Sequence, residues 1–207
     1  MKLMNLPMAV ATIALSAAAT FAGNALDLSL VTSNTVVQDG DTLTDSLTGN
    51  FKISVADSAT VTLNGAIIVG EDDEAYPWAG ITCEGNCTIV LNGDNKVRGF
   101  YNSYPGIYVP SGSTLTIKGD GSLDVGSNGK GAGIGCGKDI DCGNIEIEGG
   151  SIVAKGAWQG AAIGGAPGGS VGNITISGGV IETRSDSSFA AGIGCGVLAS
   201  AGIFSLC

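Results

Sequence analysis

The aromatic residues are the first candidates for a binding function, because they recur at one position relative to a repeated isoleucine. The residues that shortly precede this isoleucine are Tyr76, Trp78, Phe100, Tyr101, Tyr104, Trp158 and Phe189. Sugar rings stack on aromatic faces much as nucleic-acid bases do, so a column of rings would suit a linear polysaccharide. We therefore predict a carbohydrate-binding edge formed by Tyr76, Trp78, Phe100, Tyr101, Tyr104 and Trp158. The alternative is that these rings fold back over the apolar core.

A run of four acidic residues lies directly before this aromatic group. It consists of Glu71, Asp72, Asp73 and Glu74. Carboxylate oxygens are the ligands that Ca²⁺ prefers, and a bound calcium ion could bridge to an acidic sugar. The run predicts calcium as a cofactor, with a solvated charged loop as the alternative.

Several kinds of catalytic chemistry are excluded because the sequence contains no histidine. Serine and cysteine nucleophiles paired with histidine, histidine general bases and His-ligated zinc all require that residue. A pair of carboxylates can cleave glycosidic bonds, but we interpret Asp120, Asp124, Glu146 and Glu148 as outward-facing strand or turn residues. We predict no catalytic residues and a protein that is not an enzyme.

Charge and the N-terminal segment bear on partners and location. The net charge of −10 disfavours binding to nucleic acid or to an anionic membrane surface. Residues 1–25 combine Lys2, a short apolar run and small residues before candidate cleavage points, which is typical of a secretory signal peptide. We expect a secreted or cell-surface protein without a membrane insertion, and a periplasmic location is left open.

The sequence is built from repeats of 26 to 30 residues. Residues 131–159 begin GAGIGCG and contain GNIEIEGGSIVAKG, while residues 160–189 begin GAAIGG and contain GNITISGGVIETRS. Weaker copies precede them, and a further copy begins at residue 190. The anchoring isoleucines are Ile81, Ile107, Ile134, Ile163 and Ile193.

Each repeat contains a short apolar stretch, a glycine-rich turn and two strands with alternating polarity. If the apolar stretch is counted as a short strand, each repeat has three strands. Such alternation inside a fixed longer period is typical of a right-handed parallel β-helix of about five to six turns, with a β-sandwich as the alternative. We expect residues 26–59 to cap the N-terminal end and residues 60–207 to form the repeats. Because the chain stops in mid-strand at Cys207, we expect either a truncated chain or an uncapped last turn.

Aligning the repeats predicts which side chains stack between turns. The aligned positions of the middle strand that should face the core are Val61, Ile89, Leu115, Ile145, Ile174 and Phe204. The outward column beside them then reads Thr62, Val90, Thr116, Glu146, Thr175 and Ser205. An ice-binding surface would need a regular ladder of Thr-x-Thr motifs, and in this alignment the ladder is broken.

The same alignment predicts the disulfide bonds. All six cysteines lie beyond the predicted signal peptide, where disulfides are permitted, and no Cys-x-x-Cys pair points to zinc. Cys83 and Cys136 each follow an anchoring isoleucine by two residues, and Cys87 and Cys142 lie across the next turn. We predict bonds Cys83–Cys87 and Cys136–Cys142. Cys195 should be unpaired or bonded to Cys207.

The GAGIGCG and GNITI units, with the upstream strands ATVTLNG and TIVLNG, resemble secreted carbohydrate-binding-domain proteins of anaerobic, plant-fibre-degrading bacteria. The resemblance covers roughly residues 50–203. It implies a calcium-associated β-helix that binds pectic polysaccharide without cleaving it. The shared motifs are turn and ladder elements, so they transfer no binding residue to this chain.

Together these observations predict a secreted, non-catalytic protein that binds plant cell-wall polysaccharide, and the resemblance implies a polysaccharide of pectic type. A passive surface or adhesin-like scaffold is the second hypothesis. A polysaccharide lyase or hydrolase is the third.

Overall fold

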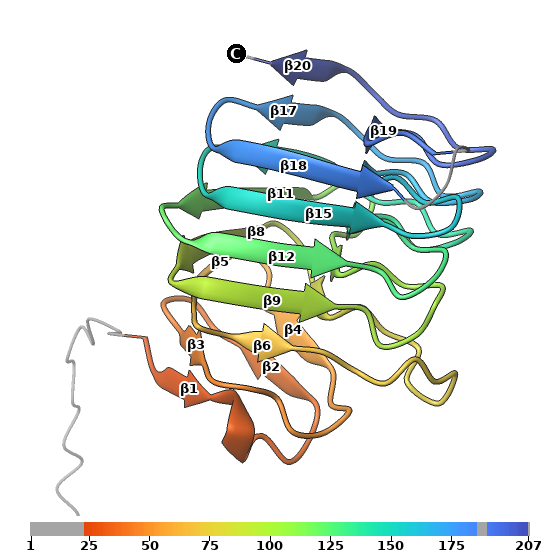
Figure 1. The fold of residues 1–207 in the computed structure, drawn as a ribbon. Helices are drawn as coiled ribbons and strands as arrows, with labels where there is room; N and C mark the ends of the chain where they lie inside the picture. Colours follow the sequence, from red (N-terminus) through yellow and green to blue (C-terminus); the bar gives the residue numbers. More distant parts are fainter. Residues whose placement is uncertain (1–22, 186–189, 207) are drawn as a thin grey trace, which may run out of the picture.

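The computed structural model describes residues 23–185 and 190–206, and their strands form a right-handed parallel β-helix of about five turns (Figure 1). The predicted signal peptide lies outside the described residues except for residues 23–25, of which Ala25 opens the first strand. Among the described residues, no helix is long and apolar enough to cross a membrane. The predicted fold class is confirmed.

Three parallel sheets form the walls of the solenoid, and each complete turn contributes one strand to each sheet. Sheet A contains β1 (Ala25–Asp27), β3 (Thr42–Thr44), β5 (Ala59–Asn64), β8 (Cys87–Asn92), β11 (Thr114–Gly119), β14 (Asn144–Ile147), β17 (Ile174–Ile176) and β20 (Phe204–Leu206). Sheet B contains β2 (Thr35–Val37), β4 (Ile53–Val55), β7 (Ile81–Cys83), β10 (Ile107–Tyr108), β13 (Ile134–Gly135), β16 (Ile163–Gly164) and β19 (Ile193–Gly194). Sheet C contains β6 (Ile67–Ile68), β9 (Asp94–Arg98), β12 (Ser122–Gly126), β15 (Ser151–Gly156) and β18 (Val180–Ser185).

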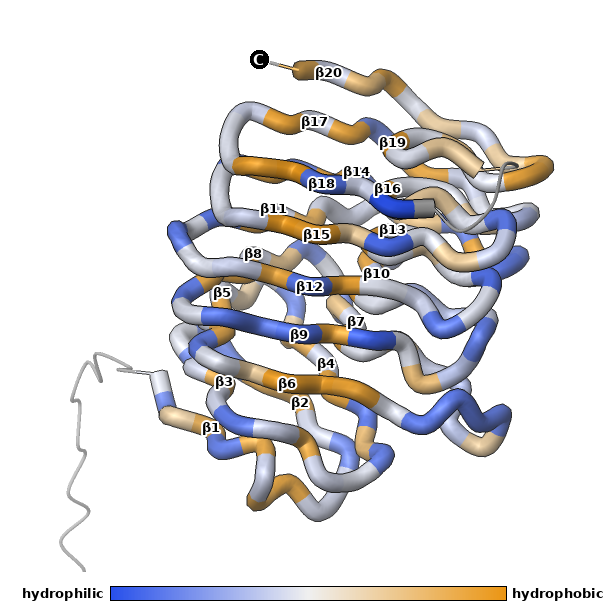
Figure 2. The backbone as a smooth tube through the Cα atoms, in the orientation of Figure 1, coloured by the Kyte–Doolittle hydropathy of each residue, from blue (hydrophilic) through white to orange (hydrophobic). Residues whose placement is uncertain are grey.

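The anchoring isoleucines form one continuous ladder through sheet B. Ile81, Ile107, Ile134, Ile163 and Ile193 pair in succession, and Ile53 of β4 extends the ladder by one more turn. The first five members of the ladder, Ile53 to Ile163, are fully buried. Hydrophobic and hydrophilic residues alternate along β12 (Figure 2), where Leu123 and Val125 are buried and Ser122 and Asp124 are half-exposed.

Residues 26–59, the predicted cap, carry strands that extend sheets A and B toward the N-terminus. A short 3₁₀ helix, η1 (Leu28–Leu30), follows β1, and Leu28 is fully buried. This end of the apolar lumen is therefore covered by Leu28 and its neighbour Val31.

The predicted alignment of the middle strands is wrong by two residues at one interface. Leu115 of β11 pairs with Cys87 and Ile117 pairs with Ile89, whereas the alignment placed Leu115 beside Ile89. A shift of two residues keeps every side chain on the same face of the sheet, so alternation alone cannot detect it. The outward column of sheet A therefore reads Thr60, Thr88, Thr116, Glu146, Thr175 and Ser205.

Both predicted disulfide bonds are present. The Cα atoms of Cys83 and Cys87 are 6.0 Å apart, and those of Cys136 and Cys142 are 5.1 Å apart. Each bond closes a short loop between a sheet B strand and the following sheet A strand. Cys195 is free among the described residues, and Cys207 lies outside them.

We expect non-reducing peptide mapping to find only the pairs Cys83–Cys87 and Cys136–Cys142 among the first four cysteines. Loops this short should contribute about 2 kcal/mol each on the chain-entropy model, so mild reduction should lower the unfolding midpoint without abolishing the fold. A peptide joining Cys83 to Cys136 would contradict the register, because Val109 of the intervening turn stands between these positions.

Candidate functional site

An aromatic cleft lies on the outer side of sheet B and has a volume of about 230 Å³. Thr82 on β7 and Tyr108 on β10 pair directly in the sheet and form its floor. Its complete lining is Lys52, Pro77, Trp78, Ala79, Thr82, Tyr104, Tyr108, Gly137 and Ile140. Four separate segments meet here: the residue before β4, the β6–β7 connection, the β9–β10 connection and the loop after β13.

Trp78 forms one wall of the cleft, and its ring is half-buried. It contacts Tyr76 in an edge-to-face arrangement at 5.6 Å between ring centroids and packs against Phe100 at 6.0 Å. Its indole Nε1 is buried and has no hydrogen-bond partner in the part of the chain that the structure describes. Trp78 is thus held in the cleft wall by its ring contacts, and its indole N–H is an unused hydrogen-bond donor.

Phe100 does not lie on the binding edge, which corrects its predicted role. Its side chain is fully buried in the core. The ring occupies the space beside Gly70, where an added Cβ would lie only 2.1 Å from the Phe100 ring. Because Gly70 has no side chain, the Phe100 ring turns inward here instead of lying on the surface.

The other predicted aromatic residues are divided between the cleft and its surroundings. Tyr104 lines the cleft, and Tyr101 packs beside it at 6.5 Å between centroids. Tyr76 contacts Trp78 but does not line the cleft. Trp158 lies outside the cleft on the β15–β16 connection, with 57% of its surface exposed and the Lys130 ammonium 5.2 Å from its ring centroid. Phe189 lies outside the described residues.

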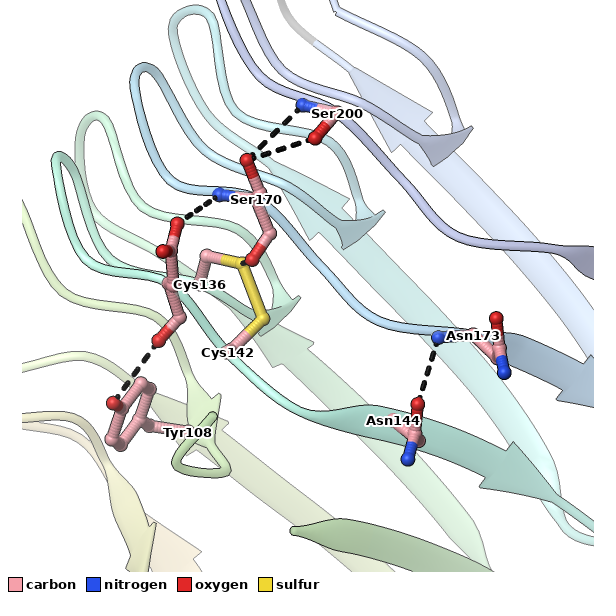
Figure 3. The surroundings of a disulfide bond; sticks show 8 residues. Tyr108, Cys136, Cys142, Asn144, Ser170, Asn173 and Ser200 are labelled. Carbon is pink, nitrogen blue, oxygen red and sulfur yellow. Dashed lines mark hydrogen bonds between the residues drawn. A yellow bond between two sulfur atoms is a disulfide. The ribbon is translucent and has the colours of Figure 1, made fainter. Parts of the chain in front are cut away.

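Tyr108, Lys52 and Thr82 complete the cleft but were not predicted as site residues. The Tyr108 hydroxyl donates a hydrogen bond to the Asp141 carbonyl at 3.2 Å (Figure 3). Burial raises the pKa of Tyr108, and the nearby Asp141 carboxylate raises it further, so the phenol is neutral at pH 7. The sequence could have indicated Tyr108 as a site residue, since it directly follows an anchoring isoleucine. Lys52 could not be predicted, because only the pairing of strands in sheet B brings it near the cleft.

The Cys136–Cys142 disulfide supports one wall of the cleft. Gly137 and Ile140, both lining residues, lie inside the loop that this bond closes. The Ser170 N–H of the next turn donates to the Asp141 side chain at 2.8 Å, and Ser170 in turn contacts Ser200 at 3.0 Å (Figure 3). The bond and this hydrogen-bonded stack hold the loop in place above sheet B.

The predicted calcium ligands do not form a coordination site. Glu71, Asp72, Asp73 and Glu74 are all exposed, and one Asp73 oxygen accepts a hydrogen bond from the Ala75 N–H at 2.8 Å. No group of three or more acidic or cysteine side chains in the described ranges could hold a metal ion. Calcium binding stays a prediction from the sequence.

The carboxylates considered for catalysis lie away from the aromatic cleft, whose described lining contains no acidic residue. Asp124 on sheet C is held between Arg98 at 2.6 Å and Lys155 at 3.4 Å. Burial alone would raise the pKa of Asp124, but the hydrogen bond and charge of Arg98, with the charge of Lys155, lower it overall. Asp124 therefore acts as an ion-pair partner within sheet C.

Comparison with known proteins agrees with this architecture. A family model described as a beta helix repeat matches residues 145–170 and 174–197, which cover β14 to β19 apart from short gaps. The fold and this match define a protein of the parallel β-helix class. No curated protein and no solved structure matches the chain.

Proposed function

We propose that this protein is a secreted, non-catalytic carbohydrate-binding protein that holds a plant cell-wall polysaccharide in the aromatic cleft. The observation that carries the proposal is the meeting of Trp78, Tyr104 and Tyr108 around one cleft. Such a site, mostly apolar with a few polar groups, is the usual form of a small-molecule pocket. Parallel β-helix proteins are also often associated with polysaccharides.

The polar groups of the cleft favour an acidic sugar. Lys52 is the single charged side chain in the described lining, and it offers an ammonium group to a carboxylate. Thr82 and Tyr108 add hydroxyl groups that can pair with sugar hydroxyls. A uronic-acid polymer of pectic type combines the ring faces, hydroxyls and negative charge that these residues would contact.

Trp158 would extend the binding surface along the solenoid. It lies on the same kind of connection as Trp78, three turns further on, and turns are spaced by about 4.8 Å. A linear polymer that runs along the axis would pass from the cleft to this exposed ring.

We expect Tyr104→Ala to weaken binding to polygalacturonate by about 1–3 kcal/mol, by analogy with base stacking on aromatic residues. Isothermal titration calorimetry against polygalacturonate, xylan and cellulose would measure the effect. Phe204→Ala is the matched control, since Phe204 is an exposed ring on the last strand, away from the cleft. Equal affinities for the wild type, Y104A and F204A would remove the cleft from the binding site and favour the passive-scaffold hypothesis.

The Lys52→Gln variant tests the choice of an acidic sugar. It should weaken binding to polygalacturonate while leaving any binding to neutral xylan unchanged. Release of unsaturated sugars during the same incubations would contradict the non-catalytic proposal and identify a lyase.

Trp78→Ala is a poorer test than the sequence suggested. A ring lying freely on the predicted binding edge could be removed with little loss of stability, but Trp78 packs against Phe100 and Tyr76. We therefore expect W78A to lower both affinity and stability, so its binding must be measured below its unfolding transition.

A further inference from the structure

The outer face of sheet A carries an uncharged, threonine-rich surface that the proposed function does not use. Its members on β3, β5, β8 and β11, with the residue before β8, are Thr42, Thr44, Thr60, Thr62, Asn64, Asn86, Thr88, Val90, Asn92, Thr114 and Thr116. We call this set the threonine face. None of these members is charged or aromatic, but Lys118 of β11 pairs with Val90 and places one charge at the edge of the set.

The threonines of this face form one regular column and the start of a second. Thr60, Thr88 and Thr116 stack in the first column. Thr42 and Thr62 begin the second, which continues with Val90 and Lys118. Neighbouring strands are about 4.8 Å apart, and alternate residues along a strand are about 6.6 Å apart. This array exists because of the two-residue register shift between β8 and β11, which brings Thr116 beside Thr88.

The array is rigid and its hydroxyl groups are available. The side chains of Thr60, Thr88 and Thr116 are half-buried by their neighbours in the column. None of these three hydroxyls hydrogen-bonds to another group in the described residues. β-branched side chains have a restricted χ1, so both the hydroxyl and the methyl group of each threonine keep a fixed direction.

A shallow trough runs along the column of Thr60, Thr88 and Thr116, on the side of Asn86 and Thr114. It has a volume of about 200 Å³, and Asn86, Thr88, Thr114 and Thr116 are among its lining residues. The Asn86 side chain is fixed because its Oδ1 accepts a hydrogen bond from the Thr114 N–H at 2.9 Å. A water molecule needs only about 10–15 Å³ of such space, so the trough has room for a row of ordered waters.

These features restrict the chemistry of a partner. The uncharged column of Thr60, Thr88 and Thr116 does not select an anionic polymer, and it offers no aromatic stacking surface for sugars. Hydroxyl groups donate and accept hydrogen bonds equally well, which suits a partner whose surface alternates donors and acceptors. The partner that is uncharged, flat and periodic, and that consists only of such groups, is crystalline water.

We propose that the threonine face binds the surface of ice crystals. The hydroxyl groups and the waters of the trough would join the outer layer of the lattice, while the methyl groups fill the spaces between them. The face ends within β11, where Lys118 pairs with Val90, and the next strand places Glu146 beside Thr116. The sequence alignment missed this surface because it placed Val90 beside Thr116.

Ice-affinity capture and inhibition of ice recrystallisation test the proposal on the full chain. The wild type should be enriched in the ice fraction relative to a non-binding protein of similar size, and it should slow crystal coarsening. Thr88→Lys, at the centre of the array, should lose both effects because a long charged side chain projects above the plane. Thr175→Lys is the matched control, since Thr175 lies in the same column but beyond Glu146, and T175K should behave as the wild type.

Circular dichroism would establish that each variant is folded, and Thr60→Lys replaces Thr88→Lys if the latter does not fold. A wild type that is not enriched in ice would overturn the proposal, as would a folded T88K that retains full activity. Polysaccharide binding measured on the same variants keeps the two proposals apart. The cleft lies on sheet B, so T88K should bind polygalacturonate as the wild type does, whichever way the ice experiment turns out.

Discussion

Phe100→Ala is expected to destabilise the protein by about 3–5 kcal/mol, the usual cost of deleting a fully buried phenylalanine ring. Phe100 is among the largest side chains that are fully buried in the described residues. Its removal would leave a cavity next to Gly70 and take away the ring against which Trp78 packs. Denaturant unfolding monitored by tryptophan fluorescence would measure the loss.

Tyr101→Ala serves as the control for this experiment. Tyr101 is the next residue in the same connection, but its side chain is half-exposed. It should therefore cost clearly less stability than Phe100. If F100A were as stable as the wild type and lost only polysaccharide affinity, Phe100 would be a surface ligand contact after all, as the aromatic pattern alone suggested.

Gly164→Ala is expected to destabilise the protein by about 3 kcal/mol, from backbone strain of about 1–3 kcal/mol and from overpacking of similar size. Gly164 has φ 128°, and an added Cβ would lie 2.0 Å from the carbonyl oxygen of Gly194 in the next turn. The preceding member of this column is Gly135, whose Cβ would in turn lie 2.2 Å from the Gly164 carbonyl oxygen. The Gly-Ile-Gly units therefore let adjacent turns approach closely.

The matched control is Gly65→Ala, because it separates the two contributions. Gly65 also has a positive φ, of 74°, but an added Cβ would meet no atom within 4 Å. G65A should cost only the conformational penalty, about 1–2 kcal/mol. Thermal unfolding of both variants would measure the difference, and equal losses would show that contact with the next turn contributes nothing.

These effects explain why the repeat motifs carry fold information and contribute no side chain to the proposed binding cleft. In GAGIGCG and GAAIGG, the isoleucine fills the lumen and the following glycine makes room for the backbone of the next turn. Most residues that line the proposed binding cleft lie instead in the connections between strands, while Thr82 and Tyr108 lie on β7 and β10. The proposed cleft is accordingly centred on Trp78, Tyr104 and Tyr108.

The sequence by itself determined the parallel β-helix, its three strands per turn and the isoleucine ladder. The reason is that the repeat length and the alternation of apolar and polar residues can be read from local sequence. A repeat cannot bury its apolar face alone, so the repeats must stack on one another as a solenoid. The two disulfides were also predictable, since each joins cysteines that are 4 or 6 residues apart across one turn.

Only the tertiary structure decided the register between β8 and β11, because a shift of two residues leaves the alternation of side chains unchanged. It also decided which aromatic rings face solvent. Phe100 and Tyr104 lie in the same connection. The Phe100 ring fills the space beside Gly70 and is buried in the core, whereas Tyr104 lines the cleft. The cleft itself joins Lys52 to Ile140 across 88 residues of sequence, and such a meeting of distant segments depends on how the turns stack.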